Sequence, residues 1–106
     1  MSIKRVWHGW TTLEDADAYQ DILLNKVIPG IEAKKISGLR KFEVLRIAKK
    51  DEVEFVTMMT YDSLEDVIGL QGKDYKKCYV PDVAQQVLKR WDQKAIHYEL
   101  IDTIDY

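Results

Sequence analysis

The spacing of apolar residues changes along the chain and predicts a strand followed by a helix. Residues 3–10 form a short segment rich in β-branched and aromatic side chains, which is typical of a strand. From Leu13 onward apolar side chains recur every three or four positions as far as Ile28, which predicts an amphipathic helix. Pro29-Gly30 is expected to end or kink this helix, which leaves residues 31–35 for one further turn.

The middle of the chain predicts an antiparallel hairpin and a second helix. Residues 39–48 and 53–61 each have the composition of a strand, and a polar turn of four residues joins them. Ser63 is expected to cap a short helix that runs from Leu64 to about Leu70 and ends at Gly72.

The C-terminal third predicts a loop, a helix and a last strand. Residues 73–79 have no clear period, so we expect a loop that carries Tyr75. Pro81 suits the first turn of a further helix, whose apolar positions are Val83, Val87, Leu88 and Trp91. Residues 96–101 read as the last strand. The predicted order is β-α-β-β-α-(α)-β.

A short repeat relates the two halves of this order. WTTLEDA at residues 10–16 aligns with YDSLEDV at residues 61–67, with an offset of 51. In each copy an aromatic residue closes a strand, a hydroxyl residue takes the N-cap, and acidic residues occupy the first turn, where the helix dipole favours them. Many helices begin this way, so coincidence is the alternative. The recurrence at equivalent places favours two βαβ-like halves and a ferredoxin-like α+β sheet of four antiparallel strands.

This arrangement predicts which side chains share a face of the sheet. The first and third strands are expected to lie side by side and parallel, with His8 beside Met59 and Trp10 beside Tyr61. The two faces would then carry Val6, His8, Trp10, Thr57, Met59 and Tyr61 on one side, and Arg5, Trp7, Val56, Met58 and Thr60 on the other. Both faces are too apolar for water and the helices cover only one, so we expect a homodimer packed sheet to sheet.

Composition and charge exclude several classes of partner. With 106 residues, of which 46% are hydrophobic and 32% charged, the chain is expected to form one globular domain over residues 1–106. A net charge of −2 gives no electrostatic case for nucleic acid or an anionic membrane. No 18 apolar residues run together and the N-terminus lacks the apolar run of a signal peptide, so we expect a cytoplasmic protein with no membrane segment.

The sequence also lacks the patterns that hold metals and cofactors. A single cysteine, Cys78, excludes an intramolecular disulfide and a multi-cysteine zinc site, and a buried, inert thiol is expected there. The two histidines lack metal-ligand spacing, and the five glycines never form a phosphate-binding loop. We therefore expect no metal and no cofactor.

Five segments between Lys4 and Ile101 carry a resemblance to a known family. They are RVWHGWT (residues 5–11), IPGI (28–31) followed by Gly38, YDS (61–63), GKDY (72–75) and HYEL (97–100). Together they resemble the dimeric α/β-barrel superfamily, and within it the antibiotic biosynthesis monooxygenase-like proteins. The resemblance implies a ferredoxin-like domain with an extra helix before the last strand, a homodimer, and a pocket between sheet and helices.

The resemblance does not fix an activity. Members of the superfamily include cofactor-independent oxygenases of aromatic polyketides, haem-degrading enzymes, small isomerases and proteins without a known reaction. The oxygenase and haem-degrading branches typically use a pocket asparagine together with Trp and His or Arg. The one asparagine here, Asn25, lies in the first predicted helix. Neither mechanism is therefore carried over.

His8 is the residue with the most chemical potential in the sequence. It lies among Trp7, Trp10 and, by the repeat, Tyr61, so it could act as a catalytic base near neutral pH. The alternative is a core histidine whose nitrogens are satisfied by neighbours. Trp7, Trp10, Tyr61 and Tyr75 are the candidates for holding a planar substrate, although aromatic residues also fill ordinary cores and dimer interfaces. The second histidine, His97, is expected to be structural, near the sheet edge or the dimer contact.

Two functions follow from these residues. The first is a homodimeric, monooxygenase-like oxidoreductase that acts on a small aromatic or polyketide-like molecule without metal or flavin, with His8 as its base. The alternative is a non-catalytic dimer that binds a small ligand or serves as a stress-related accessory protein. A cavity of several hundred Å³ beside His8 would favour the first, and a filled core there would favour the second.

Overall fold

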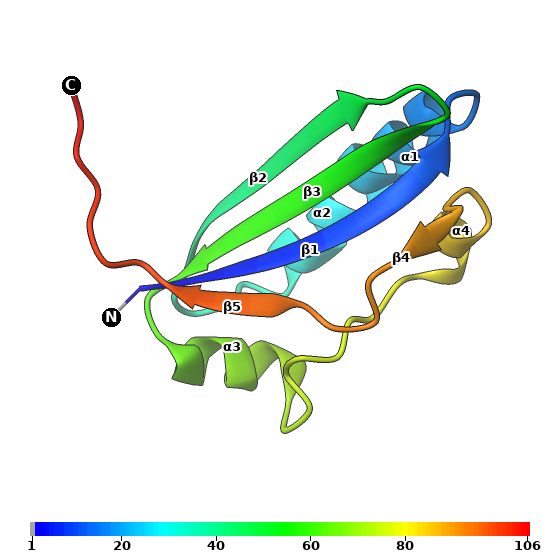
Figure 1. The fold of residues 1–106 in the computed structure, drawn as a ribbon. Coiled ribbons are helices and arrows are strands. Elements are labelled where there is room, and N and C mark those ends of the chain that lie inside the picture. Colours follow the sequence, from blue (N-terminus) through cyan, green and yellow to red (C-terminus); the bar gives the residue numbers. More distant parts are fainter. Residues whose placement is uncertain (1) are drawn as a thin grey trace.

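Three long strands form most of one antiparallel sheet in a computed structural model that describes residues 2–106 (Figure 1). They are β1 (Ile3–Thr12), β2 (Leu39–Ala48) and β3 (Glu52–Tyr61). The strand order is β2-β3-β1-β4, with β5 also pairing with β1. β4 (Arg90–Trp91) and β5 (Ile96–Glu99) follow each other along the same edge of β1. The predicted last strand, residues 96–101, is thus β5, and β4 is an additional short strand, so the sheet has five.

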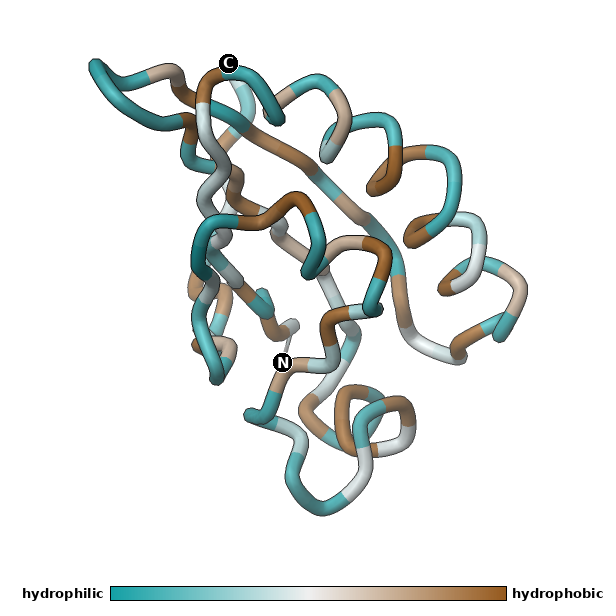
Figure 2. The backbone as a smooth tube through the Cα atoms, turned by 90° about the vertical axis from the view of Figure 1, so that its right-hand side faces the viewer, coloured by the Kyte–Doolittle hydropathy of each residue, from teal (hydrophilic) through white to brown (hydrophobic). Residues whose placement is uncertain are grey.

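The predicted first helix is longer than expected and contains a wider turn. It runs as α1 (Ala16–Ile22), the π-helical η1 (Leu23–Val27) and α2 (Ile28–Ala33). Pro29 lies in the first turn of α2 and does not end the helix. A π-helical turn shifts the hydrogen-bond register just where proline has no N–H to donate, so the helix continues through it. Figure 2 shows the apolar segments of this helix turned toward the strands.

In both copies of the repeat the hydroxyl oxygen accepts a backbone hydrogen bond, but only Ser63 caps its helix as predicted. Thr12 Oγ1 accepts a hydrogen bond from the N–H of Asp15 at 3.1 Å, and Ser63 Oγ accepts one from the N–H of Asp66 at 3.3 Å. α3 (Leu64–Gln71) follows Ser63 directly. Helix α1 begins only at Ala16, because residues 13–15 form a turn first.

The helix predicted after Pro81 is only one turn long. It is α4 (Asp82–Gln85), and Trp91 belongs to β4 and not to a helix. Backbone pairing with β1 ends the helix: the N–H of Lys89 donates to the carbonyl of Trp10 at 2.7 Å, and the N–H of Asp92 donates to the carbonyl of His8 at 2.9 Å. These hydrogen bonds to β1 override the local helical preference that the spacing of Val87 and Trp91 indicates.

The expectation that the first and third strands run parallel is wrong. β1 and β3 are antiparallel, with Arg5 opposite Met59 and His8 opposite Val56. The reason is topological. β3 forms a hairpin with β2, so it runs opposite to β2, and the helical crossover makes β1 run in the same direction as β2.

The predicted sharing of faces is therefore also wrong. Along both strands the odd-numbered residues are turned toward the helices, as the alternating burial of β1 and β3 shows. The repeat offset of 51 is odd, so it pairs a helix-facing residue of one strand with an outward-facing residue of the other. His8 and Trp10 lie on the open face of the sheet, with Val56 and Met58, and not with Met59 and Tyr61.

The core under the helices consists of two clusters. One lies between α1, α4 and the part of the β2–β3 hairpin next to its turn. It contains Ala16, Tyr19, Leu23, Val53, Phe55, Val80, Ala84 and Leu88. The other lies under α3 and contains Ile3, Met59, Tyr61 and Val67. Thr57 lies between Phe55 and Met59 on β3, at the boundary between the two clusters.

The opposite face of the sheet has no covering element among the described residues (Figure 1). Large apolar side chains on this face are about half exposed: Leu45, Ile47, Ile96 and Tyr98. None of the helices in residues 2–106 has the length and apolar character needed to cross a membrane.

Candidate functional site

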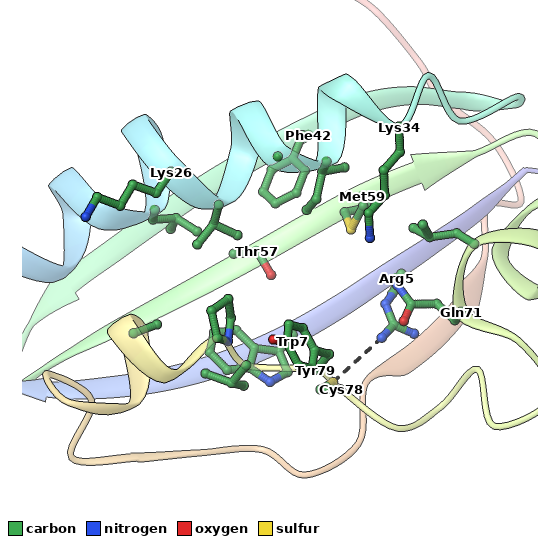
Figure 3. Close-up of a pocket in the computed structure, with 18 of the residues that line it drawn as sticks. Arg5, Trp7, Lys26, Lys34, Phe42, Thr57, Met59, Gln71, Cys78 and Tyr79 are labelled. Carbon is green, nitrogen blue, oxygen red and sulfur yellow. Dashed lines mark hydrogen bonds between the residues drawn. The ribbon is translucent and has the colours of Figure 1, made fainter.

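A cavity of about 310 Å³ lies between the sheet and the long helix, where the two core clusters meet (Figure 3). Its floor is formed by helix-facing residues of β1, β2 and β3, and its walls come from η1, α2, the end of α3 and residues 78–84. Its polar and aromatic lining residues include Arg5, Trp7, Lys34, Thr57, Cys78 and Tyr79. The volume is at the lower end of the range for small-molecule sites.

Arg5 places a buried guanidinium at one end of this cavity. The residue is only 6% exposed. Its Nη1 donates to the carbonyl oxygen of Tyr75 and to Nε2 of His97, and its Nη2 makes longer contacts of 3.4 Å to the carbonyl of Lys77 and 3.7 Å to Sγ of Cys78. Burial lowers the pKa of Arg5 from its ordinary value. Arg5 still remains a cation at neutral pH, because a guanidinium titrates far above that range.

His97 is held neutral by burial and by its position beside Arg5. Burial, the positive charge of Arg5 and that of Lys76 lower its pKa to about 4. Because Arg5 can only donate, Nε2 of His97 accepts and the ring carries its proton on Nδ1. That Nδ1 is buried and has no hydrogen-bond partner among the described residues. The rings of His97 and Tyr75 pack edge to face, with 5.1 Å between the ring centres.

Trp7 forms the aromatic floor of the cavity, and Gly9 makes room for it. The indole Nε1–H donates to the carbonyl of Asp92 at 2.9 Å, which fixes the ring. A Cβ atom at position 9 would lie only 2.6 Å from the indole Cη2 of Trp7. Only glycine therefore permits the ring to lie in this orientation.

The other polar groups of the cavity are a hydroxyl, a thiol and an ammonium group. The Thr57 side chain projects from β3 into the middle of the cavity, and Lys34 extends toward it from the end of the long helix (Figure 3). Cys78 lies in the wall, and burial raises the pKa of its thiol, so the thiol is protonated at neutral pH. Among residues 2–106, no Asp or Glu lines the cavity.

The structure places His8 away from this cavity. It lies on the open face, where its Nδ1 is 2.7 Å from Oε2 of Glu54, and Lys49 pairs with the other oxygen of the same carboxylate at 2.7 Å. The Lys49 and His8 contacts lower the pKa of Glu54. Trp10 stacks on His8 with 6.0 Å between the ring centres, and Arg90 lies over the indole of Trp10 at 4.4 Å.

The five predicted site residues are thus divided among four places. Trp7 lines the cavity, while His8 and Trp10 lie together on the other face of the sheet. Tyr61 is fully buried in the core under α3, where burial raises the pKa of its phenol to about 12. Tyr75 lies outside the cavity lining, where its carbonyl accepts from Arg5 and its ring packs against His97. Tyr79, which is 84% exposed, stands at the cavity instead.

Arg5 and Thr57 are site residues that the sequence reasoning missed. Each is a polar residue in a mostly apolar, helix-facing row of a strand. That exception to alternation was a usable signal, because buried polar side chains need a reason to be there. Which row of each strand faces the helices became clear only with the correct register.

Groups of three or more His, Cys, Asp or Glu side chains placed to hold a metal ion do not occur in the described part of the chain. No protein-family model matches the sequence, and no curated protein matches it. Solved structures, by contrast, match over almost the whole chain.

Three of these solved structures are informative. A candidate antibiotic biosynthesis monooxygenase from Bacillus cereus has a TM-score of 0.69 and 11% identity, covering 99% of this chain and 98% of its own. One from Nitrosomonas europaea has a TM-score of 0.64 and 12% identity, covering 94% and 90%. Rv0793 from Mycobacterium tuberculosis has a TM-score of 0.60 and 15% identity, covering 99% and 100%.

The chain has the ferredoxin-like fold of these monooxygenase-like proteins. The resemblance read from the sequence is confirmed at this level. At identities of 11–15% the likeness shows the fold alone. The function of this chain therefore depends on the residues of its own cavity.

Proposed function

We propose that the chain binds a small aromatic or polyketide-like molecule in this cavity and acts on it as a cofactor-independent, monooxygenase-like oxidoreductase. The observation that carries the proposal is the cavity itself, which is mainly apolar, is floored by Trp7 and lies between sheet and helix. Clefts of this size and character are the usual sites for small ligands. The fold shared with candidate monooxygenases supports the reaction class.

The reaction needs molecular oxygen as its only co-reactant. A CH₂ group flanked by aromatic carbonyl systems loses a proton, the carbanion adds O₂, and loss of water leaves a C=O group. The balance is CH₂ + O₂ → C=O + H₂O: carbon loses four electrons and oxygen gains four. The cations at the cavity, Arg5 and Lys34, would stabilise the substrate after it loses its proton.

Anthrone, a tricyclic aromatic with one such CH₂ group, provides the test. We expect oxygen uptake above the protein-free rate, with one anthraquinone formed for each O₂ consumed. Gly30→Phe should suppress it, because Gly30 lines the cavity and has free space beside it. Gly69→Phe is the matched control, since Gly69 also has free space but lies in α3, outside the lining. Uptake at the protein-free rate would contradict the proposed reaction.

We also propose that the active form is a homodimer, packed through the open face of the sheet. Half-exposed apolar side chains lie at both edges of this face: Leu45 and Ile47 on β2, and Ile96 and Tyr98 on β5. Residues 100–106 extend away from the sheet beside it (Figure 1), with Ile101, Ile104 and Tyr106 exposed. A second copy would remove both surfaces from water.

A catalytic role for His8 remains a prediction. Its pairing with Glu54 is the arrangement that orients a histidine base, but the pair lies on the open face. It would serve a substrate only where the two sheets of the proposed dimer enclose it. Loss of anthrone turnover in His8→Ala, with unchanged melting temperature, would support that role.

A non-catalytic, ligand-binding dimer is the second candidate. One observation favours it: among the described residues, neither a carboxylate nor a histidine lines the cavity. A ligand held there would meet no side chain that accepts a proton at neutral pH. Ligand binding without oxygen uptake would decide for this function.

A further inference from the structure

We infer that the ligand of this cavity is an aromatic carboxylate, and that Arg5 binds its carboxylate group. The inference rests on the ligand-binding step of the proposed function and defines the class of molecule bound. It does not depend on the oxidation.

The first observation is the isolation of the Arg5 charge. A buried cation normally has a carboxylate beside it, because taking a charge out of water is costly without a counter-charge. Among residues 2–106, no carboxylate oxygen lies within 4.0 Å of the Arg5 guanidinium. Its partners are two carbonyls, a thiol and a neutral imidazole, none of which carries a negative charge. The fold thus buries a positive charge and leaves it uncompensated.

The second observation is that the cavity around Arg5 is electropositive. Its lining includes Arg5, Lys26 and Lys34, and among the described residues it includes no acid. The chain as a whole has 18 acidic and 16 basic residues, so this set departs from the average. Lys34 extends into the cavity from the end of the helix, whereas Lys26 extends along the helix away from Arg5 (Figure 3). Arg5 and Lys34 are therefore the two cations available to one bound anion.

The third observation is that Arg5 can accept a new partner. Its two Nη2 contacts, 3.4 Å to the Lys77 carbonyl and 3.7 Å to Cys78 Sγ, are longer than good hydrogen bonds. A carboxylate oxygen could replace them with short, charge-assisted bonds, which are about twice as strong as neutral ones. The Nη1 bonds to Tyr75 and His97 would keep the guanidinium in place meanwhile.

The shape of the cavity indicates what the part of the ligand beyond its carboxylate is. Trp7 and Tyr79 lie next to each other on one side, while Arg5 lies toward the end near Gln71 (Figure 3). A flat aromatic body can lie against the two rings while an acid group attached to it reaches Arg5. The matching ligand is a small aromatic with one carboxylate at its end.

Two naphthalenes of equal shape isolate the effect of charge. The anion 2-naphthoate and the neutral 2-naphthamide are titrated into the full chain at pH 7 by calorimetry. We expect 2-naphthoate to bind at least about tenfold more tightly, as one charge-assisted hydrogen bond would give. Equal affinity of the two probes, or no binding of 2-naphthoate, would overturn the inference.

The Arg5→Gln variant assigns the preference to one residue. We expect the ratio of affinities to fall to within about threefold, whereas Arg40→Gln should preserve the wild-type ratio. Arg40 is an exposed arginine paired with Asp62. Arg40→Gln removes one positive charge, as Arg5→Gln does, and is therefore the matched control. A preference that survives Arg5→Gln would contradict the role of Arg5.

A second variant tests the inference if Arg5→Gln does not fold. Lys34 is exposed at the end of α2, so Lys34→Glu should fold normally. It should weaken 2-naphthoate severalfold and leave 2-naphthamide unchanged, and an unchanged 2-naphthoate affinity would count against the inference. Binding of 2-naphthoate with no anthrone oxidation would keep this inference and overturn the oxidoreductase. Anthrone oxidation with equal affinities for the two naphthalenes would keep the oxidoreductase and overturn this inference.

Discussion

Arg5 and His97 lie opposite each other on neighbouring strands, and the guanidinium Nη1 donates to the imidazole Nε2 across 2.9 Å. The pair joins the end of the cavity to the edge of the sheet. Because the ring is buried and the cation lies beside it, the ring stays neutral under conditions in which a free histidine would be half protonated. This relationship makes the stability of the fold sensitive to mild acid.

The first prediction concerns that pH dependence. The pKa of His97 is about 4 in the folded state, against about 6.5 when unfolded. Between these values the unfolded chain binds the proton and the folded chain does not, so the contribution of His97 is complete above pH 6.5 and is lost as pH falls toward 4. After allowance for solvent screening at this partly exposed site, we expect a loss of about 1–3 kcal/mol in the free energy of unfolding.

Urea unfolding at several pH values measures this loss. His97→Gln keeps an acceptor for Arg5 but cannot take up a proton in this range, so its stability should fall less between pH 6.5 and 4. Identical pH profiles for His97→Gln and the wild type would show that the histidine is not responsible.

The second prediction concerns the fit of Trp7 over Gly9. Gly9→Ala places a methyl group 2.6 Å from the indole, so the ring must move. We expect a loss of about 1–3 kcal/mol of stability, the usual cost of overpacking, with a change in tryptophan fluorescence. Gly69→Ala is the matched control: nothing lies within 4 Å of the added methyl, and a helical alanine should gain about 0.5–1 kcal/mol. Equal effects of the two substitutions on thermal unfolding would refute the packing argument.

The third prediction tests the proposed dimer. Leu45→Lys adds a charge to the open face, and Leu13→Lys adds the same charge at a position of similar exposure, 52% against 49%, in the turn before α1. We expect light scattering to find a dimer for the wild type and for Leu13→Lys, and a monomer for Leu45→Lys. A wild-type monomer at micromolar concentration would remove the proposal, and so would a Leu45→Lys dimer of undiminished stability.

The fourth prediction concerns access to the cavity. A phenylalanine at position 30 meets no atom within 4 Å at its Cβ, and so it should fill space beside the cavity without strain. We expect Gly30→Phe to weaken 2-naphthoate binding about tenfold, equivalent to ~1.4 kcal/mol. Gly69→Phe should bind as the wild type does. Unchanged affinity in Gly30→Phe would place the ligand elsewhere on the molecule.

Much of the fold followed from local pattern. The hairpin, the capped helix after Ser63 and the ferredoxin-like order all depend on alternation, turn residues and caps, which short segments encode. The end of the helix after Pro81 did not follow, because long-range pairing of residues 89–92 with β1 decided it. The continuation through Pro29 depended on a π-helical turn that the spacing of apolar residues does not reveal.

The site was less predictable than the fold, and one error explains most of the difference. Trp7, one of the predicted site residues, lines the cavity, but the odd offset of the repeat assigned His8 and Tyr61 to one face. The buried arginine did not stand out in the sequence, because aromatic residues and histidines are the more common residue types in sites. A cation in a helix-facing strand position was the rarer and more informative feature.

A crystal structure of the chain with 2-naphthoate tests the central claim most directly. The account predicts the naphthalene ring against Trp7 and the carboxylate within hydrogen-bond distance of the Arg5 guanidinium, in the cavity between the sheet and the long helix. A ligand bound on the open face beside His8 and Trp10, with this cavity empty, would contradict it.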